Sequence, residues 1–297
     1  MTYPLLIYCI GIFAASWTLQ VAGLYAVGGN VENTAITPWL AAAMFTPALG
    51  VLMLMFFCKA VRKEVLWRPT SRAVAVAPYA VFIPTLVAFG IVAIFVSTGW
   101  GHSSFFAFSP NGVRVVGGPW LLGRGQQGWP IFVSNVVATS IVYSLISMVF
   151  GVGEELGWRG YLQGELTQRF GLLNGLIILG LLWSFWHLPL LLAGFNYPEN
   201  RYLGAFVLSP LLLISASFFL AWLTLRSRSF WPAALAHGAG DSIQGGVTTS
   251  IQSNKPRLYV YLTELALIVV VGLVSYLLLV RRRKTATSVQ IDATQRA

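Results

Sequence analysis

Three charged residues follow a long apolar segment directly. The run 131–153 carries no charge, and Glu154, Glu155 and Arg159 come next. A charge at membrane depth costs roughly 2.5–3.5 kcal/mol on insertion scales, so such residues usually face a protein interior and serve a function. Glu155 and Arg159 are four residues apart, share a helix face and are predicted to form an ion pair. Glu154 is rotated by about 100° from Glu155, so we expect it to point into the bundle and to accept a proton as a general base.

Two of the three histidines also lie inside apolar segments. His187 follows Trp183 by four residues, and His237 precedes Asp241 by four, so each pair shares a helix face. Asp241 could orient His237, accept its N–H or act directly. Three apolar segments then each contribute an ionisable group, and we expect these groups to line one pocket toward the cytoplasmic side.

The same residues have a structural interpretation. The charges at 154–159 could be a juxtamembrane cluster solvated by water and lipid headgroups, as we expect for Glu165 and Arg169, which are also four apart. The two histidines could simply form hydrogen bonds, one to a free carbonyl and one to a neighbouring carboxylate.

Composition identifies the class of protein that must hold these groups. The 297 residues are 57% hydrophobic and 9% charged, with a mean hydropathy of +0.73. Soluble domains carry about 25% charged residues, so the chain is predicted to be a polytopic membrane protein. The net charge of +10 comes largely from bases in loops beside apolar spans, which argues for positive-inside orientation and lipid contact and against nucleic-acid binding. Cys9 and Cys58 lie in predicted spans and are expected to be small buried residues.

Eight segments are apolar over the roughly 20 residues that a membrane helix needs. They are 4–27, 39–58, 73–96, 131–153, 174–193, 204–225, 231–247 and 258–280. The predicted fold is therefore an all-α polytopic bundle at 1–284, with a motif-bearing core at 131–247 and a disordered tail at 285–297. The seventh segment is short and rich in glycine and polar residues, so neighbouring helices should shield it. The loop 97–130 is expected to cap one end of the bundle.

The distribution of basic residues orients this bundle. The loops after the second, fourth, sixth and eighth segments carry most of the bases: Lys59, Arg62, Lys63, Arg68, Arg72, Arg159, Arg169, Arg226, Arg228 and 281–284. The opposite loops carry Arg114, Arg124, Arg201, Lys255 and Arg257. The positive-inside rule then places both termini in the cytoplasm, and we expect a multi-pass protein of a prokaryotic cell membrane.

The polar motifs resemble those of the CAAX-processing and bacteriocin-processing intramembrane endopeptidases, the CPBP or Abi family that includes type II CAAX prenyl proteases. The family motifs Glu-Glu-x-x-x-Arg, Phe-x-x-x-His and His-x-x-x-Asn/Asp occur here as Glu154-Glu155-Leu-Gly-Trp-Arg159, Trp183-Ser-Phe-Trp-His187 and His237-Gly-Ala-Gly-Asp241. The resemblance covers about 151–241. It departs from the family at Trp183, where Phe is usual, and at Asp241, where Asn is often found.

The resemblance implies peptide-bond hydrolysis in or at the membrane, on the cytoplasmic side. In the version without a metal, Glu154 is the general base and, with His187, positions and deprotonates a water molecule. His237 and Asp241 would stabilise the oxyanion, where a single good donor contributes roughly 2.7–4 kcal/mol. An ionised Asp241 cannot donate to an oxyanion as Asn can, so it would need a proton or a different role.

Glu155 and Arg159 are expected to support the site by holding the catalytic residues in position. No cofactor is favoured, and the alternative is a catalytic Zn²⁺ bound by Glu154, His187 and His237. Against zinc, the chain has no His-Glu-x-x-His run. The expected partners are a peptide or protein substrate, possibly lipidated, and membrane lipids, with no nucleic acid.

Two other classes of function remain open at this point. Intramembrane Glu, His and Asp side chains are also the usual parts of a proton relay, so a proton-coupled transporter is one alternative. A non-catalytic immunity or scaffold protein that retains the same fold is the other.

Overall fold

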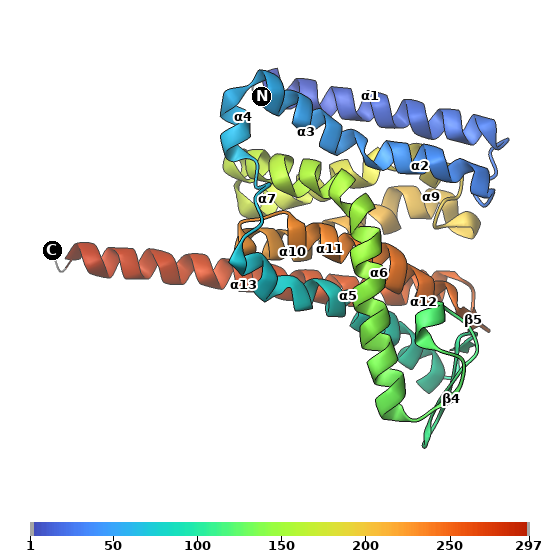
Figure 1. The fold of residues 1–297 in the computed structure, drawn as a ribbon. Coiled ribbons are helices and arrows are strands. Elements are labelled where there is room, and N and C mark those ends of the chain that lie inside the picture. The colour runs from blue at the N-terminus through green and yellow to red at the C-terminus, as the bar shows by residue number, and fades with distance from the viewer. Residues whose placement is uncertain (1–2, 296–297) are drawn as a thin grey trace.

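The structure is a computed structural model that describes residues 3–295, with side chains described for residues 3–281. It is a mostly helical bundle (Figure 1). The long helices are α1 (Tyr3–Ala26), α3 (Thr46–Phe57), α5 (Ser71–Ser97), α6 (Trp129–Gly157), α7 (Gln163–Trp186), α10 (Ser209–Ser227) and α13 (Leu258–Gln295). The short helices are α2 (Thr37–Met44), α4 (Lys59–Glu64), α8 (Leu188–Leu192), α9 (Arg201–Leu203), α11 (Trp231–Ala239) and α12 (Gly245–Thr249).

Six helical stretches of the described residues are long and apolar enough to cross a membrane. The stretch Trp129–Trp186 has 58 residues and contains most of two predicted spans, 131–153 and 174–193. These spans are separated at Gly171, whose φ of 77° and ψ of 170° break the helix. The predicted seventh span, 231–247, is not among the six. The crossing number of eight and the cytoplasmic placement of the termini therefore stay predictions, while a mostly helical fold with helices suited to span a membrane is confirmed.

The segment 231–247 forms α11, a π-helical turn at Gly240–Gln244 and α12. α11 packs against α6, α5 and α10, and most of its residues are buried. Two glycines permit the contact with α6: a Cβ on Gly238 would lie 2.6 Å from the Met148 backbone nitrogen, and one on Gly151 would clash with the Ala234 carbonyl. Neighbouring helices thus shield this polar helix, as the sequence predicts.

The loop 97–130 caps one end of the bundle and contains strands, which the all-α prediction missed. β2 (Phe106–Ser109), β3 (Gly112–Val115) and β4 (Gly125–Gln127) form an antiparallel sheet. β1 (Gly101–Ser103) pairs with β5 (Ile251–Ser253), the segment before α13. Strand edges are tolerated here because this segment lies beyond the ends of the helices, where water can satisfy the backbone.

The molecule has two distinct ends (Figure 1). We call the end with residues 59–72, 160–171 and 226–231 the basic end. These segments are joined there by hydrogen bonds from the Leu66 nitrogen to the Gly160 oxygen (3.0 Å) and from the Phe230 nitrogen to the Leu66 oxygen (3.0 Å). We call the other the strand end. It holds the five strands and the loop 194–200, where the Tyr197 ring lies 5.0 Å from that of Tyr261 near the start of α13.

The predicted disordered tail, 285–297, falls on residues whose side chains lie outside the described part of the chain. The backbone of α13 is assigned as helix to Gln295, and the tail stays a prediction.

Candidate active site

A buried ion pair forms the support of the polar cluster. Glu155 Oε1 accepts hydrogen bonds from Arg159 Nη1 at 2.9 Å and from His237 Nδ1 at 2.8 Å. Arg159 Nη2 donates to Ser217 Oγ of α10 at 3.1 Å. The side chains of Glu155 and Arg159 are both 0% exposed. The predicted pair is confirmed, and it also joins α6 to α10 and α11.

The helix that carries this pair continues well beyond the predicted end of the span at residue 153. A π-helical turn, Trp158–Leu162, follows α6, and α7 continues to the break at Gly171. A π-helical turn inside a longer helix is often found at a functional site. Both charged side chains are fully buried inside the bundle, which rules out the solvated interpretation of Glu155 and Arg159.

Glu154 is held by two tryptophans. Its Oε2 accepts from Trp183 Nε1 at 2.7 Å and from Trp158 Nε1 at 3.3 Å, and its Oε1 lies 3.9 Å from His237 Nε2. The sequence predicts that Glu154 points into the bundle, and it does so with one oxygen fixed by the two indoles and the other directed toward His237. The same Trp183 ring lies 4.2 Å from the Arg159 guanidinium carbon, in a cation–π contact.

His187 ends α7, and its ring is oriented by that helix. Nδ1 lies 2.9 Å from the Trp183 carbonyl oxygen. A carbonyl only accepts, so Nδ1 carries the hydrogen and Nε2 is left as an acceptor in the neutral ring. The hydrogen bond proposed by the structural interpretation is thus present, and it also defines which nitrogen is available for chemistry.

His237 lies between three carboxylates. With Nδ1 bonded to Glu155, its Nε2 is 3.5 Å from Asp241 Oδ2 and 3.9 Å from Glu154 Oε1. The His237 side chain is 8% exposed and that of Asp241 is 51% exposed. Asp241 is the second residue of the π-helical turn Gly240–Gln244 that follows α11, and its exposure places it on the open side of the cluster.

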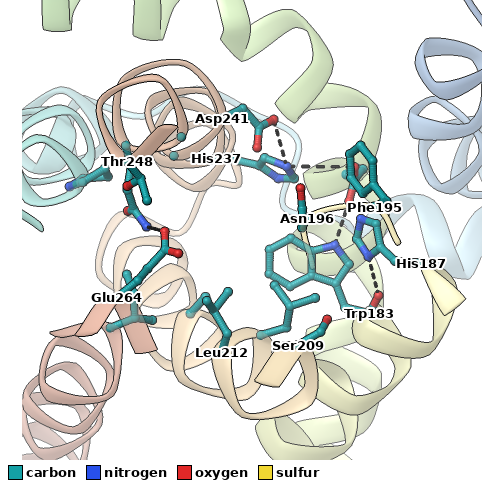
Figure 2. Close-up of a pocket in the computed structure, with 18 of the residues that line it drawn as sticks. Trp183, His187, Phe195, Asn196, Ser209, Leu212, His237, Asp241, Thr248 and Glu264 are labelled. Carbon is teal, nitrogen blue, oxygen red and sulfur yellow. Dashed lines mark hydrogen bonds and ion pairs between the residues drawn. The ribbon is translucent and has the colours of Figure 1, made fainter. Parts of the chain in front are cut away.

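A cavity of about 560 Å³ brings these groups together (Figure 2). Glu154, His187, His237 and Asp241 line it, whereas Glu155 and Arg159 lie behind its wall. Much of the remaining wall is apolar: Leu40, Met44, Ile83, Leu212, Phe219 and Ile268 are examples. A volume of this size, with few polar groups in an apolar wall, is typical of a small-ligand or peptide side-chain site. The prediction of one shared pocket is confirmed for these four residues.

The exposed residues of the cavity wall lie toward the strand end, whereas the polar cluster lies nearer the basic end, because His237 is six residues after Trp231, the first residue of α11. The sequence predicts that both the basic loops and the pocket lie toward the cytoplasm. Among the lining residues, only Asn196, Asp241 and Thr249 are exposed. Asn196 and Thr249 belong to the strand end, away from the basic loops. Glu154 likewise lies six residues before Gly160 of the basic end, so the side of the membrane on which the cavity opens stays a prediction.

Several residues of this region were not recognised from the sequence. Trp158 follows Glu154 by four residues, the same spacing that identified the Glu155–Arg159 pair, so this signal was available. Glu264 is a single carboxylate in the last apolar segment, and it lines the same cavity. Its Oε1 accepts from Gln244 Nε2 at 2.8 Å. Figure 2 shows Glu264 across the cavity from His237.

We also tested whether the site residues suit a metal ion. No group of three or more His, Cys, Asp or Glu side chains among the described residues is placed to hold one. Glu154 Oε2 is already occupied by two indole donors. The described side chains therefore do not form a zinc site as they are placed, and the use of a metal stays untested.

A model of a known protein family matches the part of the chain that holds the polar cluster. Residues 135–243 match the family model described as Type II CAAX prenyl endopeptidase Rce1-like. A relative from Methanococcus maripaludis, CAAX prenyl protease 2, is 33% identical over 81 residues, which are 25% of this chain and 29% of that protein. The chain thus matches less than a third of that relative's length. The resemblance to CAAX-type endopeptidases is confirmed for this segment, which holds all six predicted site residues.

Proposed function

We propose that this protein is an intramembrane endopeptidase that hydrolyses a peptide bond with a water molecule activated by Glu154 and His187. The observation that carries the proposal is the shared cavity, with Glu154, His187, His237 and Asp241 on its wall. The match of residues 135–243 to a CAAX-type endopeptidase family supports it.

The proposed reaction begins with water between Glu154 and His187. Glu154 takes a proton from the water, whose oxygen attacks the scissile carbonyl carbon. His187 Nε2, left as an acceptor by the bond from Nδ1 to Trp183, orients the second water proton. Glu154 then returns its proton to the leaving nitrogen, and the C–N bond breaks. A well-placed acid or base typically accelerates such steps by about 10²–10⁴-fold.

His237 has the second role, at the carbonyl oxygen. Its Nε2 borders the cavity, while Glu155 holds Nδ1 at 2.8 Å. A carboxylate on Nδ1 orients the imidazole and stabilises the positive charge of a donating ring, as in hydrolases that use a histidine–carboxylate pair. Arg159 and Ser217 fix Glu155 in turn. Asp241 Oδ2, at 3.5 Å from Nε2, positions the same nitrogen.

The substrate is proposed to be a peptide with an apolar anchor. A few polar residues, among them Glu154 and His187, line one part of the cavity, and apolar residues line most of the rest. Such a cavity suits a lipidated or transmembrane peptide better than a hydrophilic one. A soluble peptide cleaved as fast as its lipidated form would contradict this part of the proposal. The protein is proposed to act in a prokaryotic cell membrane.

A panel of quenched-fluorescent lipidated peptides tests the proposal with detergent-purified full-length protein. Glu154→Gln, His187→Ala and His237→Ala should each reduce cleavage by at least about a hundredfold. Glu165→Gln, a substitution outside the site, should leave cleavage unchanged. Full activity of Glu154→Gln would overturn the mechanism. Activity that disappears on rigorous chelation and returns with Zn²⁺ would replace it with metal chemistry.

The transporter and scaffold alternatives have their own outcomes in this experiment. A transporter would show pH-dependent flux in liposomes that Glu154→Gln blocks, without cleavage of any peptide. A scaffold would keep its biological effect in the Glu154→Ala variant. The cavity has its exposed lining residues at the strand end, whereas a transport path must reach both faces.

A further inference from the structure

We infer that Glu264, Gln244 and Thr248 form a second polar subsite in the cavity, which binds a cationic side chain of the peptide substrate and so helps to determine which peptides are cleaved. The identification of the occupant as a substrate rests on the proposed function. The subsite itself rests on a single carboxylate in an apolar helix, on the contacts of that carboxylate and on the charges that line the cavity.

Glu264 is the one charged residue in the apolar segment 258–280. It lies six residues after Leu258, the first residue of α13, and its side chain is only partly exposed. A carboxylate at membrane depth is costly and usually serves a function. Figure 2 shows Glu264 on the cavity wall across from His237, so it is separate from the cluster around Glu154.

The Glu264 carboxylate has one hydrogen-bonded neighbour. Its Oε1 accepts from Gln244 Nε2 at 2.8 Å, and no other hydrogen bond or ion pair in the described part of the chain reaches this carboxylate. Glu155 differs, because Arg159 lies 2.9 Å from its Oε1 and offsets its charge. A carboxylate in an apolar cavity without a cation has an uncompensated negative charge. Glu264 can therefore take a further partner from the cavity.

Thr248 adds a second polar group without a partner. It follows Gln244 by four residues along the same helical segment, so the two side chains share a face. Thr248 lines the cavity and is 7% exposed, and its hydroxyl has no hydrogen-bond partner among the described residues. Buried polar groups nearly always have such a partner. An unpartnered hydroxyl in the wall thus points to a ligand that supplies one.

The charges on the cavity wall favour a cation as this ligand. Glu154, Asp241 and Glu264 line the cavity, and Arg257 is the only Lys or Arg among its described lining residues. The Arg257 guanidinium donates to two backbone carbonyls, at 3.0 and 3.4 Å, and forms no ion pair with Glu264. A cavity lined by one sign of charge attracts groups of the opposite sign.

A protonated lysine side chain matches the three groups of the subsite. An ammonium has three N–H donors and no acceptor. Glu264 offers its second carboxylate oxygen, Gln244 its amide oxygen and Thr248 its hydroxyl oxygen. An arginine guanidinium carries the same charge and also only donates. An uncharged side chain of similar length would leave the carboxylate without a partner, and this is how a polar pocket rejects an analogue.

Cleavage of paired peptides tests the inference on the native full-length protein. Each lipidated, quenched-fluorescent peptide carries one Lys, which is moved through successive positions on both sides of the scissile bond. Its partner carries norleucine at the same position. At one position or at two adjacent positions, we expect kcat/KM for the Lys peptide to exceed that for the norleucine peptide by at least about tenfold, mainly through a lower KM. An Arg peptide should behave as the Lys peptide does.

Substitutions of Glu264 then test which residue reads the charge. Glu264→Gln keeps the size of the side chain and removes its charge, so the Lys and norleucine peptides should differ by less than about twofold. Glu264→Asp keeps the charge and should retain part of the preference. Glu199→Gln removes an exposed carboxylate outside the cavity and should leave the preference unchanged. If Glu264→Gln slows both peptides equally, Glu264 only supports the fold and the inference is overturned.

A binding measurement separates this inference from the proposed reaction. Fluorescence anisotropy follows labelled Lys and norleucine peptides on the Glu154→Gln protein in detergent. We expect the Lys peptide to bind at least about tenfold more tightly, and the difference should disappear in the Glu154→Gln/Glu264→Gln double variant. Such a difference, with no cleavage by the native protein, would retain the subsite and reject the peptidase. Cleavage without any preference for Lys would retain the peptidase and reject the subsite. Equal binding of the two peptides, or none, would also reject the subsite.

Discussion

Two glutamate–arginine pairs with the same spacing lie ten residues apart along the chain, and they have different environments. Glu155–Arg159 has an N–O distance of 2.9 Å with both side chains 0% exposed. Glu165–Arg169 has a distance of 2.6 Å, with the arginine 28% and the glutamate 14% exposed. Distance and spacing do not separate these pairs. Burial distinguishes them, because the charges of a buried pair have lost their water and need hydrogen bonds to other protein groups.

The surroundings of the two pairs follow from this difference. Glu155 and Arg159 also bind His237 and Ser217, which come from two other helices. Near the second pair, partial burial and a hydrogen bond to Glu165 raise the pKa of the Glu64 carboxyl, in the charged segment α4 at the basic end. The first pair is part of a site, and the second is part of a surface.

The largest difference between the two pairs should be in the unfolding free energy that is lost when the arginine of each pair is replaced. Arg159→Gln leaves a buried carboxylate with a lost partner, so we expect a loss of about 3–5 kcal/mol in unfolding free energy together with loss of cleavage. Arg169→Gln, at a partly exposed pair, should cost about 0–1 kcal/mol. Unfolding by denaturing detergent, followed by circular dichroism, measures both. Equal losses in the two variants would show that burial does not distinguish the pairs.

The glycine contacts that bring α11 to α6 should give the next largest effect. Gly238→Ala places a methyl group 2.6 Å from the Met148 nitrogen and should cost about 1–3 kcal/mol through overpacking. It should also lower cleavage, because His237 is displaced from Glu155. Gly164, beside the exposed pair, has no atom within 4 Å of an added Cβ. Gly164→Ala should therefore be neutral, or stabilising by roughly 0.5–1 kcal/mol. The same unfolding assay compares them, and a neutral Gly238→Ala would argue against close packing here.

Trp183→Phe should have a smaller and more specific effect. It keeps an aromatic side chain, smaller than the indole, and removes the N–H that donates to Glu154 at 2.7 Å. A hydrogen bond to a charged group contributes about 1.5–3 kcal/mol, so we expect kcat to fall at least about tenfold with little change in KM. Trp158→Phe is the matched control. The Trp158 indole donates to Glu154 over a longer distance, 3.3 Å, so its loss should lower kcat by a smaller factor. An unchanged kcat in the Trp183→Phe protein would mean that Glu154 does not need this donor, although the family commonly has Phe there.

The sequence predicted the parts of the site that depend on helix periodicity. The i, i+4 spacing identified the Glu155–Arg159 pair and placed Glu154 on a different face. Burial of ionisable groups in apolar segments predicted that Glu154, His187 and His237 would share a pocket, because each alone would be costly.

The parts that depend on chain continuity and on other helices were not predictable in this way. The hydropathy pattern predicted that a span ends at residue 153. In the structure, Glu155 and Arg159 form an ion pair that offsets their charges, and the helix continues to Gly171. The strand pairing of 101–103 with 251–253 joins segments about 150 residues apart, and no local pattern indicates it. Glu264 enters the site only through the packing of α13.

Replacement of Asp241 by an amide should change the cleavage rate less than substitution of the other polar cavity residues does. Its Oδ2 lies 3.5 Å from His237 Nε2, and half of its side chain is exposed, so it contributes less to stability than Glu155 does. Asp241→Asn keeps the size and adds N–H donors that can face an oxyanion, so we expect cleavage within about threefold of the native rate. Asp241→Ala should lose about tenfold, close to the effect of one weak hydrogen bond. If Asn is as impaired as Ala, the negative charge on Asp241 is what orients His237, and the carboxylate then acts on the histidine and not on the substrate. Steady-state kinetics on the same peptide panel distinguish the two outcomes.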